Sequence, residues 1–362
     1  MQPLSSSLPP RPEALSVGPV RLKPSWVIAA LIFAVGAAMC GVMVGAVSIG
    51  PGGVILELLD HVPGVDIDSG LSATRQAIVW DIRLPRVILG LMVGAMLATS
   101  GAAYQGVFRN PLADPFLLGI AAGAGLGATM SIVLGVGDGV GLADPVPIMA
   151  FMGAGLAVGL TLLVSGSISG KGTSSTLLLA GVAVAAFFTA LQTYVQSREV
   201  EQLREVYSWL LGRLSGASWD EVSLLLPYLV VSVGVMFWSR RALDVLAVGE
   251  DEARTLGIDP ARLRWVVVLA ASLAAASAVA VTGLIGFVGI IVPHVVRLMV
   301  GPSNRVVMPL SFFVGAGFLV LADLVARTVQ SPAELPIGVV TAFFGAPFFL
   351  LVLRTRDVGT GV

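Results

Sequence analysis

The chain has 362 residues, of which 56% are hydrophobic and only 12% are charged, and its formal net charge is −1. A soluble domain carries about 25% charged residues, because it must cover its surface with polar groups. The composition therefore excludes an ordinary soluble enzyme or binding module and indicates a chain that lies largely in lipid. The 43 glycines agree with this, since helices in a membrane pack closely through small residues.

Cysteine and histidine limit the chemistry available to the chain. Cys40 is the only cysteine, so it cannot form an intrachain disulfide, and the two histidines, His61 and His294, lie far apart in the sequence. A metal site usually needs three or four such ligands close together. We therefore predict no metal site and no bound cofactor.

In chain order, residues 1–24 are rich in proline and serine and predict a disordered cytoplasmic tail. The apolar run that follows is longer than the core of a signal peptide, so it is predicted to be a first span. A spanning helix needs about 20 apolar residues. Ten runs approach this length: Trp26–Ile49, Val87–Val107, Phe116–Val136, Val146–Gly166, Leu177–Val195, Val222–Trp238, Trp265–Thr282, Leu284–Val300, Val306–Ala326 and Ile337–Leu353.

The predicted fold is therefore an all-α polytopic membrane protein, with ten transmembrane helices over residues 25–356 and a cytoplasmic tail at 357–362. The seventh and eighth runs are separated because Trp265–Gly301 as one helix would measure about 55 Å, beyond the roughly 30 Å hydrocarbon core. Gly283, Gly286 and Gly289 mark the break.

Charge supports an even number of spans with both termini in the cytoplasm. In this topology 14 of the 21 Lys and Arg residues, but only 8 of the 22 Asp and Glu residues, lie in cytoplasmic segments. The cytoplasmic side is then net positive and the outer side net negative, which is the usual distribution for a membrane protein.

Two interruptions indicate irregular backbone. Residues Phe108–Pro115, with the sequence FRNPLADP, hold two prolines and leave no room for a loop, and Val292–His294 is the second interruption. Irregular backbone at membrane depth is tolerated only inside protein or beside a cavity. The Gly101–Pro111 spacing recurs at Gly283–Pro293 on the opposite side, which suggests a weak inverted repeat.

Small residues also recur at helical spacing. Gly119, Gly123 and Gly127 lie four residues apart in the third run, and Gly155 and Gly159 repeat this spacing in the fourth. Each set predicts a flat face for close helix packing. We expect these faces to pack inside the bundle rather than to form a dimer contact.

Two strings resemble enzyme motifs but fit other structures better. Gly135–Asp138 reads GVGD, as in intramembrane aspartyl proteases, yet no other span offers the second aspartate that such a site needs. Gly166–Lys171 resembles a phosphate-binding loop but is one residue too short, and Gly172 stands where Ser or Thr should bind magnesium. The chain is therefore predicted to carry no nucleotide site, so that any ATP is hydrolysed by a partner.

The charge pattern also argues against ion-coupled transport. Such a transporter would show buried carboxylates in several spans, whereas here the charges collect at the ends of the runs. Asp323 and Arg327, one helical turn apart near the outer end of the ninth run, are predicted to pair locally.

The longest cytoplasmic segment, residues 239–264, predicts a docking surface. It reads SRRALDVLAVGEDEARTLGIDPARLR. Gly249 should end one short amphipathic helix, the acidic residues that follow favour the start of another, and Gly257 suits its C-terminal cap.

Several segments together resemble the FecCD-type permeases, the membrane subunits of type II ABC importers for iron chelates, haem and cobalamin. The resemblance covers roughly Trp26 to Arg356. It is carried by RLPR from Arg83, GAAYQGVFRNPLADPFLLGIAAGAGLG from Gly101, LLLAGVAV from Leu177, LAVGEDEARTLGI from Leu246, GLIGFVGIIVPHVVRLMVG from Gly283, and ELPIGVVTAFFGAPFF from Glu334. The long N-terminal tail departs from the family pattern.

The resemblance implies a type II ABC importer fold with ten spans and a set of partners. These are a second permease subunit, in a homodimer or heterodimer, two ABC ATPase subunits and an extracytoplasmic binding protein, in a bacterial plasma (inner) membrane. Lipid surrounds the complex, and no nucleic acid is expected. By matching positions, the resemblance implies a cytoplasmic gate at Asn110, Leu112, Ser174 and Ser175, an ATPase-coupling loop at Gly249, Glu250, Ala253, Arg254 and Gly257, and docking of the binding protein at Arg83, Arg86 and Arg327.

The sequence thus predicts a permease that is not itself an enzyme and that moves an iron chelate, siderophore or haem, at the expense of ATP. Cobalamin is the alternative substrate. An ion-coupled secondary transporter is the alternative class, and a protease that depends on Asp138 is a third hypothesis.

Overall fold

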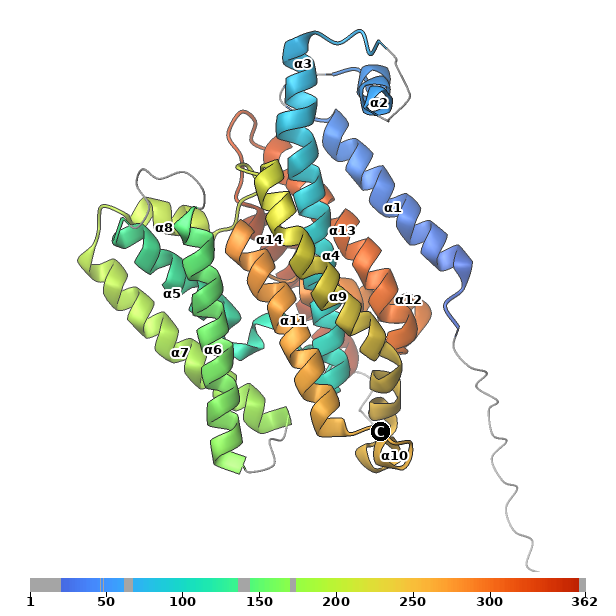
Figure 1. Cartoon of the computed structure of the whole chain (residues 1–362), viewed down its shortest axis with the longest axis vertical. Coiled ribbons are helices and arrows are strands. Elements are labelled where there is room, and N and C mark those ends of the chain that lie inside the picture. Colours follow the sequence, from blue (N-terminus) through green and yellow to red (C-terminus); the bar gives the residue numbers. More distant parts are fainter. Residues whose placement is uncertain are drawn as a thin grey trace, which may run out of the picture.

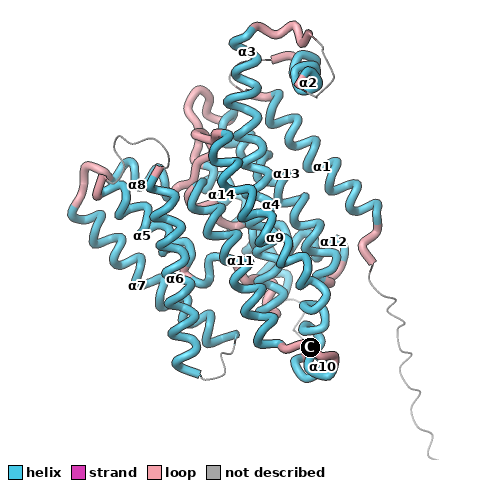
Figure 2. The backbone as a smooth tube through the Cα atoms, viewed as in Figure 1, coloured by secondary structure: helices cyan, strands magenta, loops and turns pink. Residues whose placement is uncertain are grey.

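The computed structural model describes residues 21–45, 47, 49–61, 68–135, 144–169 and 174–357. These residues form helices joined by turns and loops, without a strand among them (Figure 2). This confirms the predicted all-helical fold class. Most of the predicted tail at 1–24, the tail at 358–362, Asp138 and Lys171 lie outside the described residues.

The helices follow one another with short connections. They are α1 (Pro24–Met43), α2 (Pro51–Asp60), α3 (Ala73–Ala77), the π-helical η1 (Ile78–Arg83), α4 (Leu84–Phe108), the 3-10 turn η2 (Pro115–Leu118), α5 (Ile120–Val133), α6 (Pro145–Ser169), α7 (Ser174–Arg198), α8 (Leu203–Leu210), α9 (Trp219–Val248), α10 (Glu250–Thr255), α11 (Pro260–Thr282), α12 (Val288–Val300), α13 (Asn304–Thr328) and α14 (Ile337–Asp357).

Each of the ten predicted spans contains all or most of one apolar helix, although the third also includes most of η2 and the first runs beyond the end of α1. Among the described residues, seven helices are long and apolar enough to cross a membrane: α1, the continuous stretch from α3 to α4, α6, α7, α9, α11 and α13. Helices α5, α12 and α14 are apolar but shorter. The predicted break between the seventh and eighth spans is confirmed, because α11 ends at Thr282 and α12 begins at Val288.

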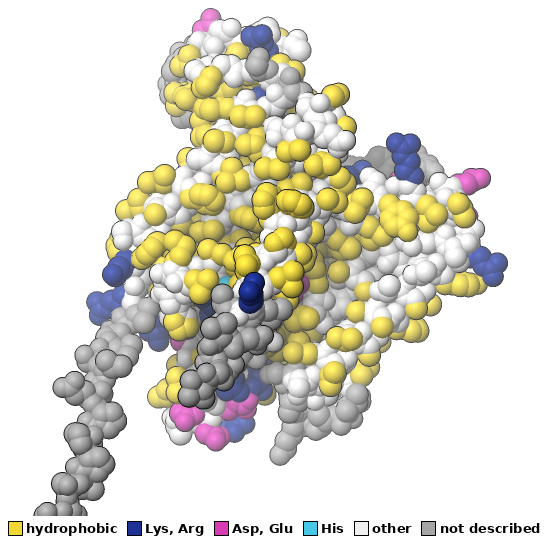
Figure 3. All heavy atoms as spheres, turned by 180° about the vertical axis from the view of Figure 1, so that it is seen from behind, with side chains coloured by type: hydrophobic (Ala, Val, Ile, Leu, Met, Phe, Trp, Pro, Cys, Tyr) yellow, Lys and Arg dark blue, Asp and Glu magenta, His cyan; other side chains and the backbone are white. Residues whose placement is uncertain are grey.

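Helix α4 lies at the centre of the bundle, with α9, α11, α12 and α13 packed around it (Figure 1). The apolar window of the α3–α4 stretch is 89% buried, compared with 28% for α1 and for α7. Helices α1 and α7 therefore lie at the periphery, and their exposed apolar side chains point away from the bundle. Figure 3 shows the resulting broad apolar surface, with charged side chains gathered toward its ends.

Close packing around α4 depends on glycine. A Cβ atom placed on Gly101 would lie 1.8 Å from the carbonyl oxygen of Gly289 in α12, so the two backbones are nearly in contact. No other residue type fits this crossing without moving a helix.

The predicted glycine faces are only partly correct. Added Cβ atoms at Gly123 and Gly127 would lie 2.3 and 2.0 Å from backbone oxygens of α6, so this face of α5 packs inside the bundle as predicted. Gly155 and Gly159 have nothing within 4 Å of an added Cβ atom, so the prediction for α6 was wrong. Helix α6 meets α5 through a different face, which includes Gly153 and Ala157.

The second predicted interruption is also displaced. Pro293 lies inside α12, and the irregular backbone instead covers residues 283–287, where Gly283 and Phe287 have positive φ angles of 73° and 68°. A helix keeps its course through proline when neighbours satisfy the freed carbonyl. The Gly101–Pro111 and Gly283–Pro293 spacings therefore fall on unlike structures and give no support to an inverted repeat.

The predicted cytoplasmic loop is reorganised as well. Its first part does not form a separate short helix, because α9 continues as one 30-residue helix to Val248. Only α10 stands apart, and α11 begins at Pro260. At the opposite end of the molecule, the 36-residue stretch Ala73–Phe108 begins with α3 and extends beyond the other helices, and α2 also lies there (Figure 1).

We expect Gly101→Ala to destabilise the protein, because the added methyl group would press on the backbone of α12. Overpacking of this kind costs about 1–3 kcal/mol of unfolding free energy. Thermal unfolding in detergent should show a lower midpoint for this variant than for the native chain. The matched control is Gly155→Ala, which adds the same methyl group to open space. Equal midpoints for the two variants would contradict the close approach of α4 and α12.

Candidate functional site

At the end of the bundle that the predicted topology places outside the cell, called the outer end from here on, a buried ion cluster joins α4 to α13. The Nε and Nη2 atoms of Arg86 donate hydrogen bonds of 2.8–3.1 Å to the carboxylate of Asp323. Its Nη1 and Nη2 atoms each donate a 2.9 Å bond to Glu334, in the segment before α14. One guanidinium thus binds two carboxylates in a forked geometry, which lysine could not reproduce.

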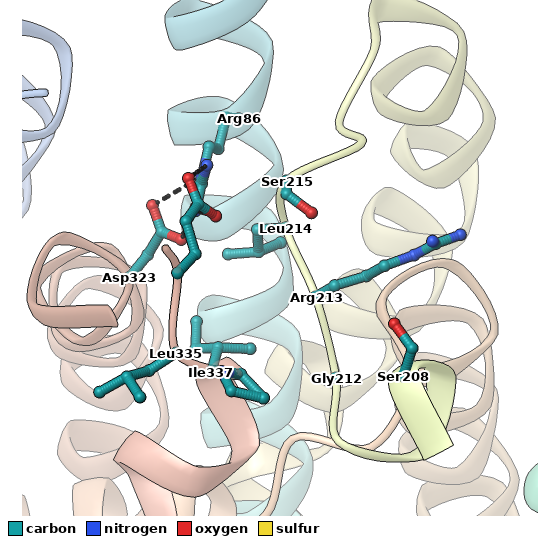
Figure 4. Close-up of a pocket in the computed structure, with 11 residues that line it drawn as sticks. Arg86, Ser208, Gly212, Arg213, Leu214, Ser215, Asp323, Leu335 and Ile337 are labelled. Atoms are coloured by element: carbon teal, nitrogen blue, oxygen red, sulfur yellow. Dashed lines mark hydrogen bonds and ion pairs between the residues drawn. The ribbon is translucent and has the colours of Figure 1, made fainter. Parts of the chain in front are cut away.

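This cluster lines a cavity of about 170 Å³. Arg86 and Asp323 point toward one another on one side, and residues 212–215, between α8 and α9, pass along the other side (Figure 4). The Arg86 side chain is only 10% exposed, whereas that of Glu334 is 39% exposed. Glu334 is therefore the member of the cluster most accessible to water and to a partner.

Arg83 and Arg327 also have partners within the chain. Arg83 lies at the end of η1 and donates to the backbone carbonyls of Val42, Met43 and Val47. Arg327 donates to the carbonyl of Gly41, and its Nε lies 3.5 Å from the Asp323 carboxylate. The last contact confirms the predicted local pairing of Asp323 with Arg327.

These contacts bear on the prediction that the three arginines dock a binding protein. Arg83 and Arg86 do not stand at the start of a helix, because the helical stretch begins at Ala73. All three side chains are buried and hold α1, α4 and α13 together at the outer end. Docking through them stays a prediction, and it requires a partner group to reach them through the surrounding protein.

Irregular segments meet beside this cluster, and their backbone N–H and C=O groups form hydrogen bonds with one another. The backbone N–H of Arg213 donates a 2.8 Å bond to the carbonyl of Thr282, where α11 ends. The N–H of Gly338 donates to the carbonyl of Leu211 at 3.0 Å. Three separate parts of the chain therefore close the outer side of the bundle without leaving these backbone groups unpaired.

At the opposite end, the predicted gate segment is a compact turn between α4 and η2. Arg109 ends α4 in a left-handed conformation with φ 50° and ψ 36°. Asn110 accepts a 3.0 Å bond at its Oδ1 atom from the N–H of Leu112, and Asp114 accepts a 2.7 Å bond from the N–H of Phe116. The irregular backbone predicted here is thus confirmed, and side chains of the segment itself stabilise it.

The other two predicted gate residues lie at the start of α7. Ser175 has an interaction partner within the protein, and Ser174 is the first residue of the helix. The turn η2 packs on α7, since a Cβ atom at Gly181 would lie 2.1 Å from the carbonyl oxygen of Leu117. The two gate segments therefore belong to adjoining elements, and their role in gating stays a prediction.

The predicted coupling residues form a short helix and its two ends. Gly249 separates α9 from α10, Glu250 is the first residue of α10, and Ala253 is the residue of α10 that is fully buried. Gly257 has a φ of 76°, which confirms the left-handed cap expected there. Helix α10 lies beyond the lower end of the bundle in Figure 1, at the end of α9.

Glu250 forms ion pairs with three basic side chains around α10. Its carboxylate contacts Arg264 at the start of α11, Arg254 at 3.7 Å within α10, and Arg109 at 3.5 Å at the end of α4. The hydrogen bond from Arg264 is the main cause that lowers the pKa of Glu250 below its usual value. The carboxylate is therefore ionised at neutral pH and below.

A second tie at this end joins α9 to α13. The Asp244 carboxylate accepts hydrogen bonds from the hydroxyl of Ser303 at 2.7 Å and from the N–H groups of Asn304 and Arg305, at 2.5 and 3.3 Å. It thus caps the N-terminus of α13 from another helix and offsets the partial positive charge there.

Sequence reasoning missed the partners of Arg86, Asp244 and Glu250. Arg86 and Asp323 are 237 residues apart, and Asp244 lies 60 residues from Asn304, so no local spacing links either pair. Only the fold brings these residues together, and the same holds for Glu250 and Arg109, which are 141 positions apart, whereas Arg254 lies one helical turn from Glu250. Among the described residues, His, Cys, Asp and Glu nowhere form a group of three that could bind a metal ion.

We expect Gly257→Val to disturb the end of α10 without affecting membrane insertion. A β-branched residue at a φ of 76° is strained by roughly 1–3 kcal/mol, and the position has open space around it, so the effect is one of backbone conformation alone. ATP hydrolysis by the assembled complex should become less dependent on transport, or the complex should dissociate. Gly286→Val is the matched control, because an added Cβ atom there also meets nothing within 4 Å but φ is not positive. Normal complex yield and normal ATP-dependent uptake with Gly257→Val would contradict the role of this cap.

Comparison with known proteins agrees with this arrangement. Residues 30–355 match the FecCD transport family. The chain is 42% identical to the cobalamin import system permease protein BtuC of Halobacterium salinarum, over 86% of this chain and 83% of that one. It is 36% identical to the Fe(3+)-citrate import system permease protein YfmE of Bacillus subtilis, over 86% and 89% of the two chains.

A solved structure has the same fold. It is a metal-chelate type ABC transporter in an inward-facing conformation, which covers 92% of this chain and 100% of its own with a TM-score of 0.79 and 29% sequence identity. The family match spans nearly all of the described helices, and the relatives match over most of their own length. This chain therefore belongs to the FecCD transport family and is a multi-pass membrane permease of an ABC importer.

Proposed function

We propose that this permease imports an iron chelate, a siderophore or haem, that an extracytoplasmic binding protein delivers. A second permease subunit completes the pathway, and two ATPase subunits bind at the α10 side. The observation that carries the proposal is the family match over residues 30–355, together with α10 at the end of α9. The solved metal-chelate type transporter, with a TM-score of 0.79, supports the substrate class.

Cobalamin is the second candidate substrate. The 42% identity to a cobalamin import permease favours it, whereas the relative named for Fe(3+)-citrate import is 36% identical. Both substrates are bulky and enclose a metal ion within an organic ligand. The permease walls therefore need to pass a large molecule rather than to coordinate a bare metal ion.

We expect ATP hydrolysis and uptake only from the assembled complex. The purified permease alone should neither bind nor hydrolyse ATP, because the GSISGK string lacks the spacing and the Ser or Thr of a phosphate-binding loop. Proteoliposomes that hold the permease, its ATPase and its binding protein should accumulate ⁵⁵Fe-labelled siderophore or haem when ATP is enclosed.

Labelled cyanocobalamin, tested in the same vesicles, separates the two substrates. Uptake of cobalamin without uptake of any iron chelate would overturn the first proposal and establish the second. Uptake driven by an ion gradient in the absence of ATP would contradict the importer class itself. Vesicles without the binding protein provide the control for leakage.

We further propose that the outer arginines receive an acidic side chain of the binding protein, and that Glu334 holds the place of this group in the free permease. Arg86 binds Asp323 and Glu334 at once, and Glu334 is the more exposed of the two carboxylates. Its bond to Arg86 lowers the pKa of Glu334, so it is ionised and competes with an incoming carboxylate. An arriving acidic residue would then replace Glu334 on the same guanidinium.

Glu334→Gln is therefore expected to tighten docking of the binding protein at low salt, and Arg86→Gln to weaken it. Affinity should fall as salt rises in each case, because the contact is ionic. Surface plasmon resonance on the complex in nanodiscs measures the dissociation constant of the binding protein for each variant. Thermal unfolding of each variant provides the control. Arg86→Gln removes a partner of the buried Asp323 carboxylate and should cost roughly 3–5 kcal/mol, whereas Glu334 is 39% exposed, so Glu334→Gln should change the unfolding little. If Glu334→Gln leaves the affinity within twofold while unfolding is unchanged, Arg86 serves only to hold the helices together.

A further inference from the structure

We propose that Glu250 positions the gate segment, by tying α10 to the end of α4 through Arg109. The inference rests on the proposed function, in which α10 receives the movement of the ATPase. It assigns a role to Arg109, which the sequence did not single out, and it names the contact through which that movement reaches the gate segment.

The geometry places Glu250 between three elements. It is the first residue of α10, and its Oε1 atom faces both Nη2 of Arg264 in α11 and Nη2 of Arg109, the latter at 3.5 Å. The remaining contact, with Arg254, stays within α10. Glu250 therefore makes two external contacts, one to α11 and one to the segment that follows α4.

The backbone of Arg109 is a second, independent observation. Its φ of 50° lies in the left-handed region, where glycine or asparagine normally ends a helix. A long side chain in this conformation is strained by about 1 kcal/mol or more. Glycine would end α4 without this cost, so the presence of arginine indicates that its side chain is used, and the partner of this side chain is Glu250.

Arg109 is joined directly to the predicted gate. The next residue is Asn110, whose side chain accepts the N–H of Leu112, so these residues form one hydrogen-bonded turn. The backbone N–H groups of Arg109 and Asn110 both donate to the carbonyl of Gln105 in the last turn of α4. A displacement of α10 that pulls on Arg109 must therefore move or break this turn.

The contact is suited to a transmission that opens and closes. The side chains of Arg109 and Glu250 are 43% and 33% exposed, so their pairing is screened by water and contributes little to stability. The bond of Glu250 to Arg264 is the more buried of its two external contacts, because the Arg264 side chain is only 18% exposed. Glu250 thus stays with α11 and α10, while its contact with Arg109 can form and break in each cycle.

The test measures gate movement without knowledge of the substrate. Cys40 is the only cysteine, so Cys40→Ser with Leu112→Cys leaves one thiol, at the gate. The permease is assembled with its ATPase in nanodiscs, and the rate of thiol labelling by a charged maleimide is compared without nucleotide and with ATP and vanadate. The ratio of the two rates reports how far the gate responds to ATP, and the ATPase rate is recorded for each variant.

We expect Arg109→Gln to reduce this ratio by about threefold, a factor in keeping with the modest free energy of a partly exposed ion pair, while ATP hydrolysis continues. Glu250→Gln should have at least the same effect, and the double variant should be no worse than Glu250→Gln alone. Arg109→Lys, which keeps the positive charge, should restore part of the response. A double variant that is no worse than Glu250→Gln shows that the effects of Arg109→Gln and Glu250→Gln do not add, which identifies a direct interaction.

Arg241→Gln is the matched control, because it removes an exposed charge from the same end of α9, and no contact with Glu250 is found for it among the described residues. Its effect, whatever its size, should add to that of Glu250→Gln. An unchanged labelling ratio with Arg109→Gln, or simple additivity of Arg109→Gln with Glu250→Gln, would overturn the proposed link. If the permease that carries only Cys40→Ser and Leu112→Cys shows no ATP-dependent labelling, the proposed function itself fails. This outcome is distinct from the others.

Discussion

The structure depends on one constraint, the free-energy cost of an unpaired polar group in a surrounding that offers no water. In lipid each unsatisfied backbone N–H or C=O group costs several kcal/mol, so chain that is not helical must find partners inside the protein. Helices meet this need for most of the chain. The irregular stretches meet it in pairs, as where Arg213 donates to Thr282 and Gly338 donates to Leu211.

The same constraint explains why charged side chains lie at the two ends of the bundle and act there as connectors. Arg83 pairs with three carbonyls near the outer end of α1, and Arg86 holds α4 to α13. At the other end, Asp244 caps α13 from α9, and Glu250 binds basic groups of α4, α10 and α11. The apolar middle of the bundle packs through side-chain shape, while the ends are fixed by charge.

Much of this architecture could be predicted from composition and local pattern. The ten apolar runs, the break at Gly283 and the cap at Gly257 each depend on residues close in sequence, whose helix-forming or turn-forming behaviour is local. The faces of helices were less predictable. Glycine spacing marks a face that could pack closely, but only the fold decides whether a partner lies there, as Gly155 demonstrates.

In the candidate site, too, some residues could be predicted from the sequence and others could not. Four candidate residues lie in segments where proline, asparagine and glycine predict irregular backbone: Asn110, Leu112, Gly249 and Gly257. The pairing of Arg86 with Asp323 and that of Glu250 with Arg109 were not, because ion pairs between residues more than a hundred positions apart leave no trace in a single sequence. The burial of Arg86 was missed for the same reason: an arginine near the end of an apolar run is expected to be exposed until its carboxylate partners are known.

The continuity of α9 has a mechanical consequence. Its 30 residues form a rod of about 45 Å, which begins at the outer end with a capping box between Ser218 and Glu221 and is bound there to η1 by the hydrogen bond from Trp219 to the carbonyl of Trp80. Asp244, near the other end of α9, caps α13, so a rotation of α9 by about 5° around its outer end would displace α10 and the start of α13 together, by about 4 Å. The outer end would meanwhile hardly move. One helix can thereby let the inner side of the permease shift while the outer side stays closed.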